Sequence, residues 1–315
     1  MGDVTITLPY IQGFKNAYPD VQIDFLTRLE NTTIPSCIEL FCHVYALKGG
    51  TDVRQQVLHA FLLGFQLRST GYDMVIDLQN NKVSRLIRKI LAPKAWSEFD
   101  RQSPTPAGAR TQNSIASAGL DHFDPSFNLK IKNLKRGMNI LTNAGWTGER
   151  LVLLNPAGFL PSRNWPLDNY VELSRLLTNF LGEVKFLILG IDRMSDKATY
   201  LEQHIGDPVI NLTGRTSPDE AFAIIQHVAL TVSEDSGLMH MSWVSGKPTI
   251  ALFGSSRSDW SRPLGDHSVC LNSADLECGE CMQENCQFGD VRCLTRFTPQ
   301  MIMEEILKLL NHQYD

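Results

Sequence analysis

Residues 230–246, LTVSEDSGLMHMSWVSG, contain the residue types of an anion-binding turn. An apolar run ends in the carboxylates of Glu234 and Asp235, and Ser236-Gly237 then opens a helical pattern that carries His240. Free N–H groups at a helix start bind phosphate, and a glycine there lets a ligand approach the backbone. We therefore expect the carboxylates to hold a ligand's hydroxyls or the helix start, and the N–H groups to hold its phosphates. The alternative is a capped helix with a buried histidine and no ligand.

Other strand-like runs end in comparable residues. LVLLN leads to Arg163, FLILG ends at Gly190, and VINL is followed by the polar turn 213–216. Open parallel sheets bind ligands at the carboxyl ends of their strands, so these residues should lie along one edge. A dinucleotide fingerprint, a P-loop and a metal-binding D-x-D pair are absent from the sequence, which disfavours nicotinamide, flavin and metal-dependent sugar-transfer chemistry.

Cysteines are concentrated in one segment near the end of the chain. Of seven in total, Cys278, Cys281, Cys286 and Cys293 form the pattern C-x2-C-x4-C-x6-C. Four closely spaced thiols are compatible with a structural zinc site, although the spacing matches no standard finger. Iron–sulfur ligation and a reduced loop without metal are the alternatives. The odd total makes a disulfide framework a poor interpretation.

Composition limits the class of protein. The chain has 315 residues, of which 43% are hydrophobic, and a net charge of −5. This length suggests two domains, and the mild acidity argues against nucleic acid as a partner. The sequence shows neither an apolar run of about 20 residues nor a signal peptide, so we expect a cytoplasmic protein. Peripheral contact with a membrane through a surface patch stays open.

Short apolar runs alternate with helical patterns, which predicts α/β domains with parallel sheets. We expect strands at 21–27, 43–48, 72–78 and 95–99, and, in the second half, at 151–158, 184–190, 208–214, 230–235 and 248–254. A helix is predicted over 52–68 and another over 298–311. The segment 101–149, rich in Pro, Gly, Ser, Thr and Asn, is interpreted as loops and a linker with one short helix.

The segment SEDSGLMHMSWVSGKPTIALFG resembles the block D-[TS]-G-x-x-H-x-A-x-x-x-G-K-P of family 9 glycosyltransferases, the lipopolysaccharide heptosyltransferases. Only the alanine differs, where Ser242 stands. Four further segments resemble the family's patterns in the same order: MGDVTITLPYIQGFKNAYPDVQIDFLT, YDMVIDLQNN, RNWP and NLTGRTSPDE. The family implies a GT-B fold, with two Rossmann-like doubly wound domains facing each other across a cleft. The expected domains are 1–145 for the acceptor and 146–297 for the nucleotide sugar, with 298–315 returning towards the first.

The resemblance also implies roles for individual residues. It places the catalytic base on Asp3, in a turn after the first strand of the family, and implies metal-independent transfer with inversion from a nucleotide sugar, commonly ADP-heptose. The acceptor would be lipid-linked or an oligosaccharide of the lipopolysaccharide core. The expected donor-binding residues are Arg163, Gly190, Thr213, Gly214, Arg215, Thr216, Asp235, Ser236, Gly237, Leu238 and His240. No cofactor is required by this chemistry.

Two features depart from the family. The chain begins at Met1-Gly2-Asp3 without the family's first strand of about eight residues, so we expect the first sheet to lack a central strand. The cysteine cluster is the second departure. Competing interpretations are the same fold acting on another nucleotide sugar, a nucleotide-sugar epimerase, and an inactive GT-B module that binds a nucleotide or a partner.

Overall fold

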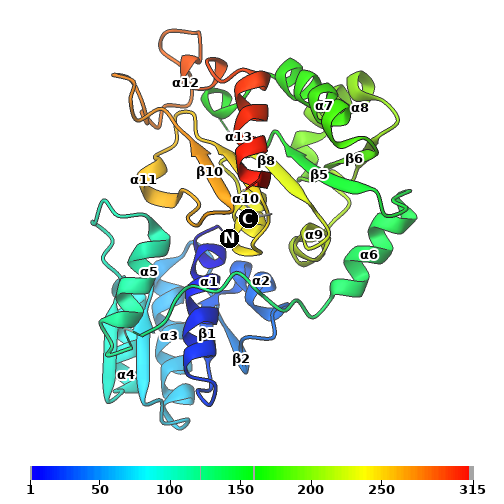
Figure 1. The fold of residues 1–315 in the computed structure, drawn as a ribbon. Helices are drawn as coiled ribbons and strands as arrows, with labels where there is room; N and C mark the ends of the chain where they lie inside the picture. The colour runs from blue at the N-terminus through cyan, green and yellow to red at the C-terminus, as the bar shows by residue number, and fades with distance from the viewer. Residues whose placement is uncertain (1, 121, 159, 312–315) are drawn as a thin grey trace. The chain divides into compact units, whose positions relative to one another are not determined.

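The computed structural model describes residues 2–120, 122–158 and 160–311 (Figure 1). The chain divides into two compact units, with the boundary between Lys132 and Asn133. Within the described residues, no helix is long and apolar enough to cross a membrane.

The N-terminal unit contains two small parallel sheets among its described residues. One pairs β1 (Asp24–Arg28) with β2 (His43–Leu47), and the other pairs β3 (Met74–Asp77) with β4 (Ala95–Glu98). In the described part of the chain no strand ladder joins β1 to β3, which agrees with the expectation that the first sheet lacks a central strand. A side-chain hydrogen bond connects the two sheets instead. The hydroxyl of Tyr72, just before β3, donates to the carboxylate of Asp24 in β1 at 2.6 Å.

The first helix includes Asp3, which was expected to lie in a turn. The helix α1 runs from Gly2 to Ala17, so Gly2 and Asp3 belong to its first turn and do not form a tight turn. Ile6, Tyr10, Ile11 and Phe14 recur at helix spacing along α1 and are all buried. The remaining helices of this unit are α2 (Thr33–Ser36), α3 (Val53–Arg68), α4 (Lys82–Leu91) and α5 (Ala107–Ala116).

The C-terminal unit is built on one parallel sheet. Its described strands are β5 (Arg150–Asn155), β6 (Val184–Ile188), β7 (Val209–Asn211), β8 (Leu230–Glu234), β9 (Thr249–Leu252) and β10 (Ser268–Leu271), in the order β10-β9-β8-β5-β6-β7. The chain winds in one direction from β5 to β7 and in the other from β8 to β10. The topological switch point therefore lies between β5 and β8, where ligands bind in such sheets.

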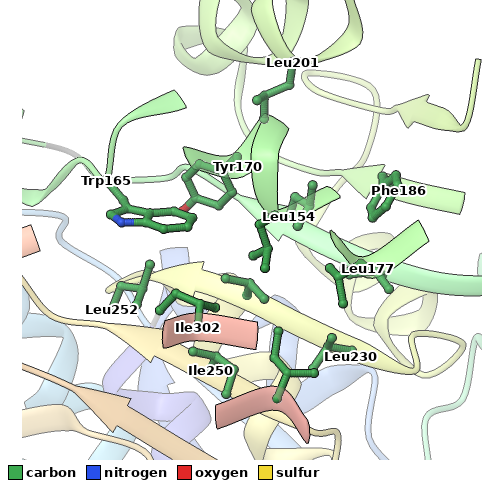
Figure 2. Close-up of a cluster of buried hydrophobic side chains, with 14 of the residues drawn as sticks. Leu154, Trp165, Tyr170, Leu177, Phe186, Leu201, Leu230, Ile250, Leu252 and Ile302 are labelled. Atoms are coloured by element: carbon green, nitrogen blue, oxygen red, sulfur yellow. The ribbon is translucent and has the colours of Figure 1, made fainter. Parts of the chain in front are cut away.

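The helices of this unit are α6 (Leu134–Asn143), α7 (Leu167–Leu181), α8 (Ser195–Ile205), α9 (Pro218–Ile225), α10 (Gly237–Val244), α11 (Ser258–Ser261), α12 (Arg292–Thr295) and α13 (Pro299–Asn311). The core lies between the sheet and the helices α7 and α13 (Figure 2). Trp165 and Tyr170 pack edge to face there, with ring centroids 4.8 Å apart.

The last helix belongs to the C-terminal unit. Ile302, Ile306 and Leu309 are buried in that unit's core, and α13 packs against α7, β9 and β10. Burial of such side chains contributes roughly 1.5–3 kcal/mol each. The apolar face of α13 is thus used within the C-terminal unit, and the expected return of residues 298–315 towards the first domain stays a prediction.

The segment 101–149 is more ordered than its composition suggested. It forms α5 and α6, and α6 packs on α9 so closely that a Cβ on Gly137 would lie 2.6 Å from the carbonyl carbon of Ala223. This contact draws α6 into the C-terminal unit and places the boundary after Lys132, earlier than residue 145. The sequence interpretation also missed β10, a strand of only four residues.

Candidate functional site in the C-terminal unit

A polar side chain ties the two strands at the switch point. Asn155 ends β5 and is paired in register with Ser233 of β8. Its amide donates to the hydroxyls of Ser233 and Ser236, each at 2.8 Å. The turn after β8 is therefore held against the end of β5, and the segments after both strands share one edge of the sheet.

Glu234 does not face a ligand. Its side chain is fully buried and accepts hydrogen bonds from the backbone N–H groups of Trp165, at 2.6 Å, and Gly158. Burial raises the pKa of Glu234 to about 7. The expectation that this carboxylate holds a ligand's hydroxyls or the helix start is wrong, because it fixes the loop 156–165 that carries Arg163.

Lys197 of α8 supports the same loop, and the sequence interpretation missed it. Its ammonium donates to the Pro156 carbonyl at 2.9 Å and to the Asn164 side chain at 2.5 Å. Burial lowers the pKa of Lys197, whereas the neighbouring Glu234 carboxylate acts in the opposite direction. Gly158 fits here because it lacks a side chain, since a Cβ would lie 2.3 Å from the Arg163 carbonyl oxygen.

Three predicted site residues converge on this loop. The Arg163 guanidinium lies 3.8 Å from the Asp235 carboxylate, and both side chains are less than one-fifth exposed, at 18% and 17%. The His240 Nε2 lies 4.0 Å from the other oxygen of Asp235. Arg163 is therefore no ordinary surface arginine. Its Nε is buried and has no hydrogen-bond partner in the described part of the chain.

The start of α10 has the geometry expected of an anion site. Ser236 is the N-cap, and its hydroxyl accepts a hydrogen bond from the Met239 N–H at 3.2 Å. Asp235 is therefore not the cap. A Cβ on Gly237 would meet no atom of the described residues within 4 Å, so the helix start is open on that side. His240 is buried one turn in, and its Nδ1 accepts a hydrogen bond from the Trp243 indole N–H at 3.2 Å.

Gly190 and Gly214 come together after β6 and β7, because the Gly214 N–H donates to the Gly190 carbonyl at 2.8 Å. Both have positive φ, +158° and +71°, a region that favours glycine. Thr213 and Thr216 of this turn are half-buried, and Arg215 is exposed. Leu238 lies half-buried at the start of α10.

Unpartnered polar atoms mark the same edge of the sheet. Within the described residues, buried atoms without a hydrogen-bond partner include Asn155 Oδ1, Arg163 Nε, Thr213 Oγ1 and Ser256 Oγ. Each of these residues follows or ends a strand of the C-terminal sheet. Buried polar groups are normally hydrogen-bonded, and the carboxyl ends of the strands are where a ligand is expected in a sheet of this kind. Ser256 was missed, although the run PTIALFG ends next to it.

The cysteine segment lies against the site loop, and the described residues give no support to the zinc site that its spacing allows. Among the described residues, no three or more His, Cys, Asp or Glu side chains are arranged to hold a metal ion. Burial raises the pKa of the Cys293 thiol to about 11, and Cys286, Cys281 and Cys278 act on this pKa in the same direction. The backbone of this segment holds the loop that carries Arg163, because the Ser162 N–H donates to the Glu284 carbonyl at 3.2 Å.

Asp3 lies in the N-terminal unit, exposed in the first turn of α1. Its role as the catalytic base stays a prediction.

Comparisons with known proteins find similarity in both sequence and fold. The family model described as glycosyltransferase family 9 (heptosyltransferase) matches residues 111–292. The chain is 27% identical over 171 residues to lipooligosaccharide heptosyltransferase 2 of Haemophilus influenzae, an alignment covering 52% of this chain and 48% of that protein. The chain thus spans about half the length of that curated relative.

Two solved structures share the fold over nearly the whole chain. A family 9 glycosyltransferase from Veillonella parvula superposes with a TM-score of 0.82 at 17% identity, covering 99% of this chain and 95% of that one. The ADP-heptose lps heptosyltransferase II of E. coli superposes with a TM-score of 0.71 at 19% identity, covering 100% and 97%. These likenesses establish the GT-B fold.

Proposed function

Because the chain belongs to glycosyltransferase family 9, we propose that it transfers a heptose or related sugar from a nucleoside-diphosphate donor to a lipopolysaccharide core acceptor. The observation that carries this proposal is the convergence of Arg163, Asp235 and His240 at the switch point of the C-terminal sheet. The names of the relatives, a lipooligosaccharide heptosyltransferase and an ADP-heptose heptosyltransferase, favour ADP-heptose as the donor.

The donor diphosphate binds between Arg163 and the start of α10. The guanidinium presents its donors as a fork that matches phosphate oxygens, and the helix start adds N–H groups and the positive end of a dipole. The open space beside Gly237 admits the phosphate. The distance from the Arg163 guanidinium to the Asp235 carboxylate is 3.8 Å, which is long for an ion pair. A phosphate oxygen can therefore bind the guanidinium without breaking a short ion pair.

The remaining contacts with the donor lie at the same edge of the sheet, where the carboxyl ends of the strands meet. Asp235 accepts hydrogen bonds from hydroxyls of the sugar, which lies next to the diphosphate. The nucleotide base and ribose lie towards the turn 213–216, where the buried Thr213 hydroxyl has no partner within the described residues. Gly190 and Gly214 keep the backbone of this part of the site close to the ligand.

The reaction is a displacement at the anomeric carbon with inversion. Asp3 takes the proton of the acceptor hydroxyl, the hydroxyl oxygen bonds to the anomeric carbon, and the bond from that carbon to the diphosphate oxygen breaks. A general base of this kind contributes typically about 10²–10⁴-fold. The nucleoside diphosphate leaves with the added negative charge, which Arg163 and the α10 N–H groups stabilise. These groups supply the positive charge that a divalent metal provides in metal-dependent transferases.

The test combines binding and turnover. Calorimetric titration with ADP and with UDP should show tighter binding of ADP, and ADP-heptose should be consumed with a heptose-deficient core acceptor in a buffer containing EDTA. Mass spectrometry of the acceptor identifies the sugar added. Binding of UDP-sugars in preference to ADP would assign another donor, and nucleotide binding without turnover of any donor would support an inactive GT-B module.

A further inference from the structure

The outward face of α3 is apolar. The helix uses Ala60, Leu63 and Leu67 for its buried side, and Gly64 brings it against Ile90 of α4. The remaining large apolar side chains of the helix are exposed: Val53, Val57, Leu58, Phe61, Leu62 and Phe65. Leu58 and Leu62 keep 64% and 61% of their surface exposed. A continuous apolar surface of this kind on a protein that folds in water marks an interaction site.

Five residues form a single stripe along this face. Arg54, Leu58, Phe61, Phe65 and Arg68 are spaced by alternating steps of four and three residues, which places them on one side of a helix. The rings of Phe61 and Phe65 lie 4.8 Å apart, so the apolar centre of the stripe is continuous. A guanidinium stands at each end. We call these five residues the α3 stripe.

The neighbouring helix has the same sign of charge. In Figure 1, α3 and α4 lie side by side within the N-terminal unit, and residues of the two helices are in contact. On α4, Lys82, Arg85 and Lys89 are exposed. Neither helix contains an Asp or a Glu, although the whole chain has a net charge of −5. Apart from the N-cap Asp52, the charged side chains of these two helices are therefore all positive, and the partner that fits is anionic.

From this arrangement we propose that the α3 stripe docks the N-terminal unit on a bilayer surface that contains anionic lipids. Leu58, Phe61 and Phe65 enter the boundary between headgroups and acyl chains, while Arg54 and Arg68 reach lipid phosphates with their long side chains. A second copy of the chain is a poorer occupant, because its α3 and α4 would bring the same positive charges to the interface. The inference depends only on α3 and α4, and it stands independently of the proposed sugar transfer.

Vesicle sedimentation tests this proposal with the full chain. The protein should pellet with vesicles that contain phosphatidylglycerol and much less with pure phosphatidylcholine, and the difference should shrink at about 0.5 M salt, where surface charges are screened. The double substitution Phe61→Ser/Phe65→Ser should lower the partition coefficient at least about tenfold, because it removes two large apolar groups. Arg54→Glu/Arg68→Glu should weaken the preference for phosphatidylglycerol, and the remaining preference comes from the cations of α4.

A matched control is available in the other unit. Phe180 of α7 is 52% exposed, so Phe180→Ser removes an exposed ring without touching the stripe and should leave vesicle binding unchanged. Thermal unfolding midpoints of all variants verify that the exposed substitutions leave the fold intact. Equal vesicle binding by the wild-type protein and Phe61→Ser/Phe65→Ser would overturn the proposal. A lipid-free dimer, seen by analytical ultracentrifugation and dissociated by the same substitutions, would assign the face to a second copy instead.

Discussion

The carboxylate of Glu234 accepts a hydrogen bond of 2.6 Å from the backbone N–H of Trp165. Glu234 ends β8, whereas Trp165 closes the loop after β5. Because β5 and β8 are neighbours at the switch point, this bond fixes the loop of one strand to the end of the other. The loop carries Arg163, so the position of the guanidinium depends on a buried acid that does not itself face the ligand site.

Replacing Glu234 by glutamine should destabilise the protein and change its pH dependence. An amide nitrogen cannot accept from a backbone N–H, so one of the bonds to Gly158 and Trp165 is lost, at a cost of about 1–3 kcal/mol. The folded pKa of about 7 lies above the ordinary value of 4.5, so the folded state binds this proton more tightly than the unfolded state. The stability gained from that proton is complete below pH 4.5 and is lost as pH rises through 7.

The wild-type free energy of unfolding should therefore decline between those two pH values by an amount on the order of 3 kcal/mol at most. Urea unfolding at several pH values measures this slope, and Glu234→Gln should have a flatter profile over the same interval. Parallel profiles of the two proteins would show that the carboxyl does not titrate there.

Arg163→Ala should weaken binding of ADP by about 1.5–3 kcal/mol, the usual contribution of a hydrogen bond to a charged group. Calorimetric titration measures the change. The control is Arg175→Ala, which removes an exposed arginine whose partner is Glu172 on the same helix, and which should leave ADP affinity unaltered. If both variants bind ADP as the wild-type protein does, the diphosphate lies elsewhere.

Asp3→Asn should lower turnover at least about 100-fold, because an amide keeps the size of the side chain but cannot take the acceptor's proton. Donor affinity should stay nearly constant, since the proposed donor contacts all lie in the C-terminal unit. Steady-state kinetics with ADP-heptose, together with ADP titration, separate the two quantities. Turnover comparable to that of the wild-type protein would exclude Asp3 as the base.

Ile306→Ala should cost about 2–5 kcal/mol of stability through the lost burial and the cavity left behind. Ile306 is fully buried in the core of the C-terminal unit, so the loss should appear as a lower urea midpoint. Met301 of the same helix is 44% exposed, and Met301→Ala serves as the control with little expected change. An equal, small effect of both substitutions would contradict the place of α13 in this core.

The sequence by itself determined most of the C-terminal unit. Continuous apolar runs such as LVLLN and FLILG predict buried parallel strands, and Ser217-Pro218 and Ser236-Gly237 mark helix starts, because these signals are local. The convergence of Arg163, Asp235 and His240 was also predictable, since the carboxyl ends of parallel strands share one edge.

Only the tertiary structure decided which polar residues face the site and which support it. Glu234 and Asp235 are adjacent in sequence, yet one is buried against the N–H of Trp165 and the other faces Arg163. Consecutive side chains at the end of a strand point to opposite faces, and which face is covered depends on a loop from a different strand. The ammonium of Lys197, the packing of α6 on α9 and the place of α13 depend equally on contacts between segments far apart in the chain. A local sequence pattern does not predict such contacts, because they form only when distant segments come together in the folded chain.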